Sequence, residues 1–255
     1  MQLREVRTLD GKQQADLVRA RGRVQGARGE FTKSEYVLRA LVGTDDAQAD
    51  DAALLRFLRA RELRVPAAHA MVQKWQAWRA DFGVDGITEA DIAAEAATGK
   101  AYWWGHDRQR RACVVIRPRL HWPGKFSTED SMRFAAFMME TGVKKTEALG
   151  SEKICVIYDR EGMTRQNIDF SMFGVLQSLL GMVQDFYAER LGAVYVLHAN
   201  WLYHAIFGML KPFLTERTKS KMKLLGSPAE LGEYFELDQL PEYYREACER
   251  GGALR

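Results

Sequence analysis

Histidine is the side chain most often used for acid–base catalysis and metal binding near neutral pH. The sequence has five, and they are scattered: His69, His106, His121, His198 and His204. None has a second histidine or a cysteine at the spacing of a metal site, so we expect no zinc centre. His198 and His204 are close enough in the chain to approach one another. We interpret this pair as packing or pocket lining and not as a catalytic couple.

Two other catalytic signatures are missing from the sequence. The pair Gly99-Lys100 lacks both the upstream glycine and the following Ser or Thr of a phosphate-binding loop. The G-x-S-x-G turn that presents a nucleophilic serine does not occur either. We therefore expect no enzymatic activity and no cofactor.

An apolar stretch followed by a basic one is the most unusual feature of the chain. Residues 201–214 read WLYHAIFGMLKPFL, and the polar or small residues His204, Gly208 and Lys211 fall on one narrow helical stripe. A helix that is apolar over most of its circumference has to be covered on several sides. At fourteen residues it is too short to cross a bilayer. The pattern fits a core helix, or a helix that closes over a hydrophobic cavity or enters a membrane surface.

The elements around this stretch predict an α/β fold. Apolar runs at 112–116, 153–159 and 193–200 are typical of strands covered on both faces, and helical patterns separate them. This alternation implies a mostly parallel sheet with right-handed crossovers, flanked by helices. Residues 31–86 contain three helical segments, which we interpret as an N-terminal helical annex.

Composition narrows the class of protein. Hydrophobic residues make up 47% and charged residues 28%, the balance of a folded globular chain. The net charge is only +3 and is concentrated in residues 1–29, so we expect no nucleic-acid partner. Three widely spaced cysteines favour a reducing compartment, and no apolar run is long enough for a membrane span. We expect a cytoplasmic protein whose membrane contact is peripheral.

Several motifs together resemble the CRAL-TRIO lipid-binding family, in particular its phosphatidylinositol-transfer type. In chain order they are LLRFLRAR, VIYD, ERLG, LKPFL and KSKMKLLG, and the resemblance runs from about residue 50 to 240. It implies one α/β domain that encloses a hydrophobic lipid pocket, closed by a gate helix over residues 202–214. The residues it implies for the gate and the pocket lining are Ile206, Phe207, Leu210, Phe213 and Leu214.

The resemblance also implies a headgroup site. The positions that surround the inositol phosphate in the family correspond to Arg59, Glu189, Thr218 and Lys221. Cationic donors suit a phosphate, and hydroxyls and acceptors suit a ring of hydroxyls. Taken singly, Arg59 and Glu189 also fit ordinary surface or helix-end charges. Ala188 replaces the proline of the family's Y-P-E-R signature, and the positions linked to phosphatidylcholine lack most of their hydroxyls.

Together these observations predict a monomeric, non-enzymatic protein that transfers a phospholipid, best phosphatidylinositol, between membranes. A carrier of an isoprenoid such as tocopherol or retinal, and a lipid-regulated protein-interaction module, are the alternatives. The predicted organisation is a basic flexible tail (1–30), the helical annex (31–98), the lipid-binding domain (99–245) and a C-terminal tail (246–255).

Overall fold

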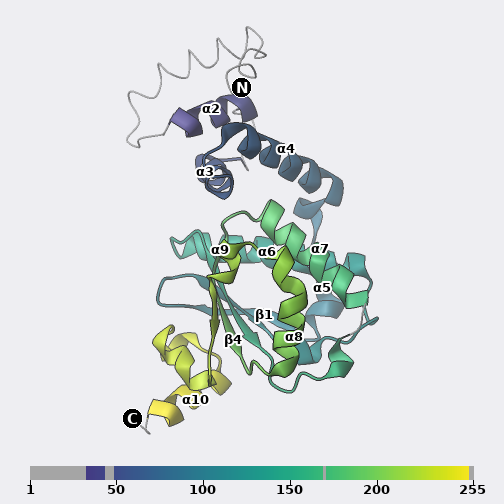
Figure 1. Cartoon of the computed structure of the whole chain (residues 1–255), viewed down its shortest axis with the longest axis vertical. Coiled ribbons are helices and arrows are strands. Elements are labelled where there is room, and N and C mark those ends of the chain that lie inside the picture. The colour runs from purple at the N-terminus through teal and green to yellow at the C-terminus, as the bar shows by residue number, and fades with distance from the viewer. Residues whose placement is uncertain (1–32, 44–48, 169–170, 253–255) are drawn as a thin grey trace. The chain divides into compact units, whose positions relative to one another are not determined.

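The computed structural model describes residues 33–43, 49–168 and 171–252 (Figure 1). The chain divides into two compact units, residues 1–82 and residues 83–255. The predicted basic tail lies outside the described residues. The predicted domain limits stay predictions.

The described part of the first unit, residues 33–43 and 49–82, is mainly helical, as expected for the annex. Its helices are α2 (Lys33–Val42), α3 (Asp51–Ala60) and α4 (Val65–Phe82). Asp50 caps α3, because its carboxylate accepts a hydrogen bond of 2.7 Å from the Ala53 backbone N–H. The apolar stripes of α3 and α4 pack together, with Leu58 and Val72 fully buried.

The second unit is an α/β unit with one five-stranded sheet. Its strands are β1 (Ala101–His106), β2 (Ala112–Ile116), β3 (Ile154–Asp159), β4 (Leu191–Leu197) and β5 (Met222–Leu224). Its α-helices are α5 (Glu89–Ala96), α6 (Thr128–Ala148), α7 (Ser171–Phe186), α8 (Trp201–Leu210), α9 (Glu216–Lys219) and α10 (Glu242–Gly252). Its 3₁₀ turns are η3 (Val84–Gly86), η4 (Pro118–Leu120), η5 (Arg165–Asn167), η6 (Lys211–Phe213), η7 (Pro228–Glu233) and η8 (Leu237–Gln239).

The strands lie in chain order, β1 to β5. Strands β2 to β5 are parallel, and β1 pairs antiparallel with β2 at the edge of the sheet. The predicted mixed α/β fold, with a mostly parallel sheet flanked by helices, is confirmed. Because β3, β4 and β5 are parallel, their amino ends meet at one edge of the sheet and their carboxyl ends at the opposite edge.

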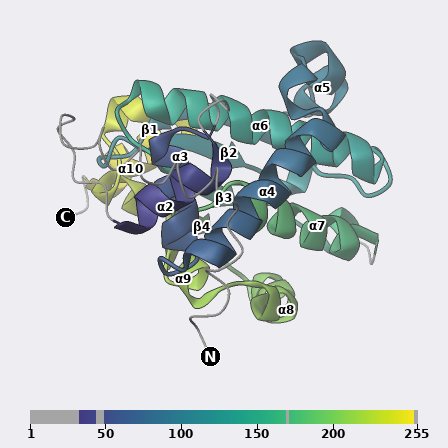
Figure 2. The ribbon, with the colours of Figure 1, turned by 90° about the horizontal axis from the view of Figure 1, so that it is seen from above.

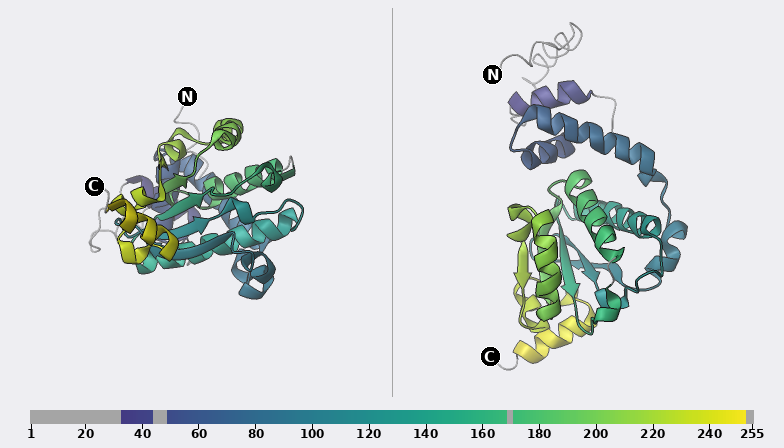
Figure 3. Two further views of the ribbon diagram at one scale, coloured as in Figure 1. Left: turned by 90° about the horizontal axis from the view of Figure 1, so that it is seen from below. Right: turned by 45° about the vertical axis from the view of Figure 1, so that its right-hand side comes forward.

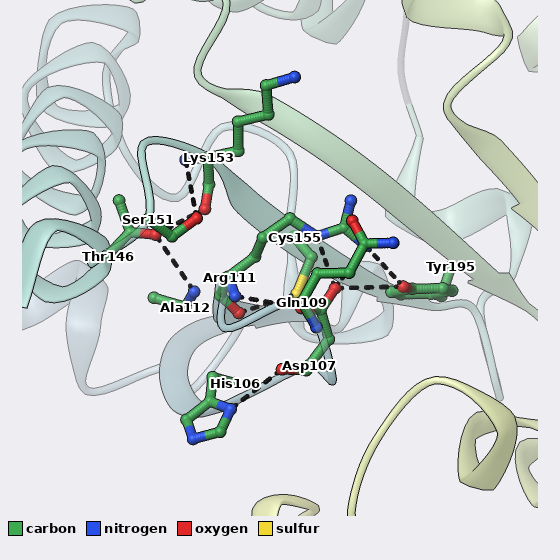
Figure 4. A network of polar contacts seen from close by, with 10 residues as sticks. All are labelled: His106, Asp107, Gln109, Arg111, Ala112, Thr146, Ser151, Lys153, Cys155 and Tyr195. Atoms are coloured by element: carbon green, nitrogen blue, oxygen red, sulfur yellow. Dashed lines mark hydrogen bonds and ion pairs between the residues drawn. The ribbon is translucent and has the colours of Figure 1, made fainter. Parts of the chain in front are cut away.

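One face of the sheet is closed by the C-terminal segment. Side chains of β2, β3 and β4 on this face are almost completely buried and pack against η7, η8 and α10; examples are Val115, Ile157 and Tyr195 beneath Phe235 and Tyr244. A buried polar network secures the turn between β1 and β2 on the same face (Figure 4). In it, Arg111 pairs with Asp107 at 2.5 Å and donates to the Tyr195 hydroxyl at 3.1 Å.

The opposite face faces α6 and α8. Trp103 of β1 donates its indole N–H to the Met138 carbonyl of α6, and the Tyr203 ring of α8 stacks against Arg160, which directly follows β3. Figures 2 and 3 show α7 running beside α6. Strand alternation therefore places the even-numbered residues of β3 and β4 under these helices.

This second face is incompletely covered. Four residues are only half-buried, although two of them lie on the interior strands β3 and β4: Ile116, Val156, Tyr158 and Val194. Their neighbours Ile157 and Tyr195, which point to the closed face, are 0% and 1% exposed. We call these four residues the accessible sheet face. An apolar surface of this kind in the middle of a helix-covered sheet is suited to an apolar ligand.

Gly142 allows α6 to approach the sheet. A Cβ atom there would lie 2.2 Å from the Trp103 ring, whose position is fixed by the hydrogen bond to Met138. We expect Gly142→Ala to lower the free energy of unfolding by about 1–3 kcal/mol, measured by urea denaturation. Gly181→Ala is the matched control: no atom lies within 4 Å of a Cβ on this α7 residue, so it should raise stability by about 0.5–1 kcal/mol. Equal effects of the two substitutions would contradict the packing described here.

Candidate functional site

Glu189 lies in the turn between α7 and β4. Two buried neighbours hold this turn: Tyr187 donates its hydroxyl to Glu140 at 2.9 Å, and Arg190 pairs with Glu147 at 2.6 Å. Glu189 itself has a φ of 60°, in the left-handed region that residues other than glycine rarely adopt. Backbone strain of this kind is often found at functional sites. The turn thus fixes the carboxylate at the amino end of β4.

Thr218 and Lys221 lie at the same edge of the sheet. Thr218 belongs to the short helix α9, which Thr215 caps, and the hydroxyls of Thr215 and Thr218 are 2.9 Å apart. The Lys221 carbonyl accepts a hydrogen bond of 2.9 Å from the Val194 N–H, which joins the beginning of β5 to β4. The pairing of β4 with β5 therefore brings Lys221 towards the turn of Glu189.

A group of cations surrounds Glu189. The structure pairs its carboxylate with Arg217 at 2.9 Å, a residue that the sequence analysis did not single out. The charge of Glu189 also acts on Lys221, as do the positive charges of Lys153 and Arg217. We call Lys153, Glu189, Arg217, Thr218 and Lys221 the cationic edge cluster. With three cations to one carboxylate it carries a surplus of positive charge, which suits an anionic ligand.

Lys221 carries its charge at a cost. Burial is the largest effect on its ammonium group and, with the nearby cations, lowers its pKa below the usual 10.5 despite the attraction of Glu189. Between the lowered pKa of Lys221 in the folded protein and its usual pKa in the unfolded chain, the unfolded chain binds more protons than the folded protein. The free energy of unfolding therefore rises with pH across that window. We expect Lys221→Met to remove this rise and to be at least as stable as the unsubstituted protein at pH 7, measured by urea unfolding from pH 7 to 10.5. A clear loss of stability at pH 7 would show instead that Lys221 is a structural residue.

Arg59 lies in the other unit. It is exposed in the last turn of α3, whereas Glu189, Thr218 and Lys221 all belong to the second unit. That Arg59 joins the other three around a ligand stays a prediction.

The apolar stretch forms a helix that is shorter than predicted. Helix α8 ends at Leu210, and residues 211–213 continue as the 3₁₀ turn η6, because Pro212 cannot supply a backbone N–H donor. Asn200 caps the beginning of α8, and its side chain accepts from the Tyr203 N–H at 3.2 Å. At the other end, Gln184 of α7 donates to the Phe213 carbonyl at 3.0 Å.

Helix α8 and η6 leave much apolar surface uncovered. Trp201, Met209 and Phe213 are 61%, 50% and 40% exposed, whereas Tyr203 is buried against the sheet. Of the other predicted gate and lining residues, Ile206, Phe207, Leu210 and Leu214 are all half-buried. An apolar helix with one face towards an accessible sheet face and another towards solvent has the form expected of a cover that can contact a membrane. Its role as a gate stays a prediction.

His198 and His204 have different neighbours. His198 Nδ1 lies 3.0 Å from a carboxylate oxygen of the buried Asp159, which also accepts from the Tyr244 hydroxyl at 2.8 Å. His204 is exposed, with its ring against Tyr203. Within residues 33–43, 49–168 and 171–252, no three His, Cys, Asp or Glu side chains gather as metal ligands. None of the helices in these ranges is long and apolar enough to cross a membrane.

The fold and the motifs belong to one family. A family model for the CRAL/TRIO domain matches residues 96–245, and one for the CRAL/TRIO N-terminal domain matches residues 28–74. The chain is therefore a member of the CRAL/TRIO family, as the motifs predicted. Sec14 cytosolic factors among its relatives support its assignment to the phosphatidylinositol-transfer type of that family.

Relatives occur in plants and fungi. The chain is 29% identical to Patellin-6 of Arabidopsis thaliana over 80% of its own length and 52% of that protein. It is 29% identical to the SEC14 cytosolic factor of Yarrowia lipolytica over 71% of its length and 39% of the relative, and 28% identical to the Sec14 cytosolic factor of Schizosaccharomyces pombe over 80% and 77%. The chain thus spans about half or less of the length of several of these relatives.

A solved structure supports the fold. The crystal structure of Sfh5 superposes with a TM-score of 0.66 and covers 82% of this chain and 83% of its own, at 15% sequence identity. At this level of identity the likeness concerns the fold alone.

Proposed function

We propose that this protein binds one phospholipid, best phosphatidylinositol, and transfers it between membranes without catalysing a reaction. The observation that carries the proposal is the accessible sheet face. Val156 and Val194 lie on the interior strands β3 and β4 under α6 and α8, yet solvent reaches them. Each CH₂ group that leaves water contributes about 0.8 kcal/mol, so acyl chains laid along this face would recover much of the free energy lost on leaving a bilayer.

The cationic edge cluster supports a phosphate-bearing headgroup. Lys221, Arg217 and Lys153 supply the donors for a phosphodiester, and Glu189 and Thr218 supply acceptors and a hydroxyl for the inositol ring. The replacement of the family proline by Ala188 leaves the turn intact, because Tyr187 and Arg190 anchor it on both sides. A neutral isoprenoid would make no use of this cluster.

The exposed side chains of α8 and η6 support exchange at a membrane. Trp201, Met209 and Phe213 would enter the interface of the bilayer while the basic residues after them contact anionic headgroups. In this account α8 moves away from the sheet only at the membrane, which keeps the lipid covered in water. We expect the protein to act as a monomer at the cytoplasmic surface.

Transfer of radiolabelled phosphatidylinositol between donor and acceptor vesicles tests the proposal. Transfer that saturates with protein and exceeds that of a neutral isoprenoid supports it. Absence of phosphatidylinositol transfer, with isoprenoid transfer retained, would move the chain to the alternative class of carriers.

A further inference from the structure

Among the described residues of the second unit, three arginines are buried, and two of these three have a carboxylate partner. Arg111 pairs with Asp107 at 2.5 Å (Figure 4), and Arg190 pairs with Glu147 at 2.6 Å. Arg160 is 2% exposed, the most deeply buried of the three, but no Asp or Glu of the described residues lies within ion-pair distance of it. Because a buried charge is costly unless it is paired, Arg160 requires an explanation.

The partners of Arg160 are weak ones. Its guanidinium donates to the Asn200 side-chain oxygen at 3.3 Å and to the Met163 sulfur at 3.2 Å. The Tyr203 ring lies beneath it, with the Arg160 Cζ 5.3 Å from the ring centroid. None of these groups is an anion, and removal from water by burial lowers the pKa of Arg160.

A second donor beside Arg160 is unused. The Tyr203 hydroxyl is buried and has no hydrogen-bond partner among the described residues. The ring of Tyr203, which belongs to α8, stacks against the Arg160 guanidinium. A buried hydroxyl without a partner costs roughly 1–3 kcal/mol. Arg160 and Tyr203 together therefore offer more hydrogen-bond donors than the neighbouring protein groups can accept from.

The position of this pair relates it to the accessible sheet face. Arg160 directly follows β3, and Tyr158, whose hydroxyl lies near enough to act on the Arg160 charge, is one of the four half-buried residues of that face. The pair thus lies at the carboxyl ends of the strands, whereas Lys221 lies at their amino ends. Seven residues of β4 separate the two edges, about 20 Å.

We propose that Arg160, Tyr203 and Tyr158 form a binding site for the carboxylate of a long-chain fatty acid, whose hydrocarbon chain lies along the accessible sheet face. The proposal rests on the proposed lipid-binding function but concerns a different ligand and the opposite edge of the sheet. A guanidinium fork matches a planar carboxylate, and one guanidinium balances its single charge.

Entry of the carboxylate would involve α8. Tyr203 covers the guanidinium and Asn200 caps the helix, so a carboxylate reaches Arg160 when the first turn of α8 shifts. The new ion pair would replace the contact to the Met163 sulfur, and the Tyr203 hydroxyl would gain an acceptor. Fatty-acid binding and movement of α8 are then linked.

Equilibrium dialysis of the full chain with radiolabelled palmitate or methyl palmitate tests the proposal. The ester keeps the hydrocarbon chain and loses the charge. We expect the unsubstituted protein to bind palmitate about 10- to 100-fold more tightly than the ester, as for loss of a charge-assisted hydrogen bond. Arg160→Met should reduce palmitate binding to the level of the ester and leave ester binding unchanged. Tyr203→Phe, which removes only the unused hydroxyl, should weaken palmitate binding and leave ester binding unchanged.

Each other outcome overturns the proposal. It fails if the protein binds neither ligand, if acid and ester bind equally, or if Arg160→Met retains the preference for the acid. Should Arg160→Met not fold, the preference of the unsubstituted protein and the effect of Tyr203→Phe decide. Phosphatidylinositol transfer without a preference for palmitate over the ester would support the proposed function and exclude this fatty-acid site. A preference for palmitate without phosphatidylinositol transfer would support the fatty-acid site and contradict the proposed function.

Discussion

Lys221→Met is expected to weaken phosphatidylinositol binding about 10- to 100-fold. The ammonium group is half-buried at the amino ends of the strands, where a hydrogen bond to a charged phosphate contributes roughly 1.5–3 kcal/mol. The loss should appear in vesicle transfer and in direct binding to vesicles that contain phosphatidylinositol. It should come without loss of stability, because burial already opposes the charge on Lys221.

Lys223→Met provides the matched control. Lys223 lies two residues further along the chain, on β5, with its ammonium over the Tyr234 ring at 4.1 Å. Tyr234 packs against the closed face of the sheet, so this substitution removes the same charge from the neighbourhood but not from the cationic edge cluster. Equal losses in Lys221→Met and Lys223→Met would mean that net charge, and not a headgroup site, governs binding.

The double substitution Met209→Asp with Phe213→Asp is expected to reduce transfer more than a hundredfold. Both side chains are exposed on α8 and η6, and each apolar side chain that enters a membrane contributes about 1.5–3 kcal/mol, while a carboxylate is repelled by anionic lipid. Cosedimentation with anionic vesicles should fall in parallel. Lipid already bound in the purified protein should be unaffected, since neither side chain is buried in the fold.

Leu237→Asp is the control for this second prediction. Leu237 is an equally exposed apolar residue, at 41%, but it lies on η8 beside the closed face. It should leave vesicle association and transfer unchanged. Loss of both in Leu237→Asp would place the membrane contact elsewhere, and normal transfer by the double variant would exclude α8 and η6 from it.

The three central strands were predictable because their signal is strong. Uniformly apolar runs at β2, β3 and β4 are what a parallel sheet buried on both faces requires, and all three occur where expected. The edge strands β1 and β5 were missed. Strand β1 contains Gly105 with a φ of 54°, close against the Gln239 backbone, and β5 has only three residues, two of them exposed. Neither pattern is distinguishable locally from a turn.

The candidate site was predictable only where motifs carried it. Glu189 and Lys221 belong to short motifs, Thr218 directly precedes one, and the pairing of β4 with β5 brings Lys221 towards Glu189. Arg217 directly precedes Thr218, but nothing in the residue pattern separates it from the neighbouring cations Lys219 and Lys221. The ion pair between Arg217 and Glu189 depends on the left-handed turn at Glu189, and no residue pattern predicts that turn.

The Arg160 and Tyr203 pair was invisible for a different reason. The two residues lie 43 positions apart and meet only because α8 lies over the end of β3. In the sequence, Arg160 looks like an ordinary turn residue after a strand. Its significance comes from burial without a carboxylate, which is a property of the folded chain.

Native mass spectrometry of the purified full chain, followed by extraction and identification of what it carries, tests the central claim most directly. If the accessible sheet face holds the apolar part of a lipid, the protein should carry one amphiphile per chain, or take one up from vesicles, and release it on denaturation. A chain that stays free of lipid after incubation with mixed vesicles, while correctly folded, would contradict the account.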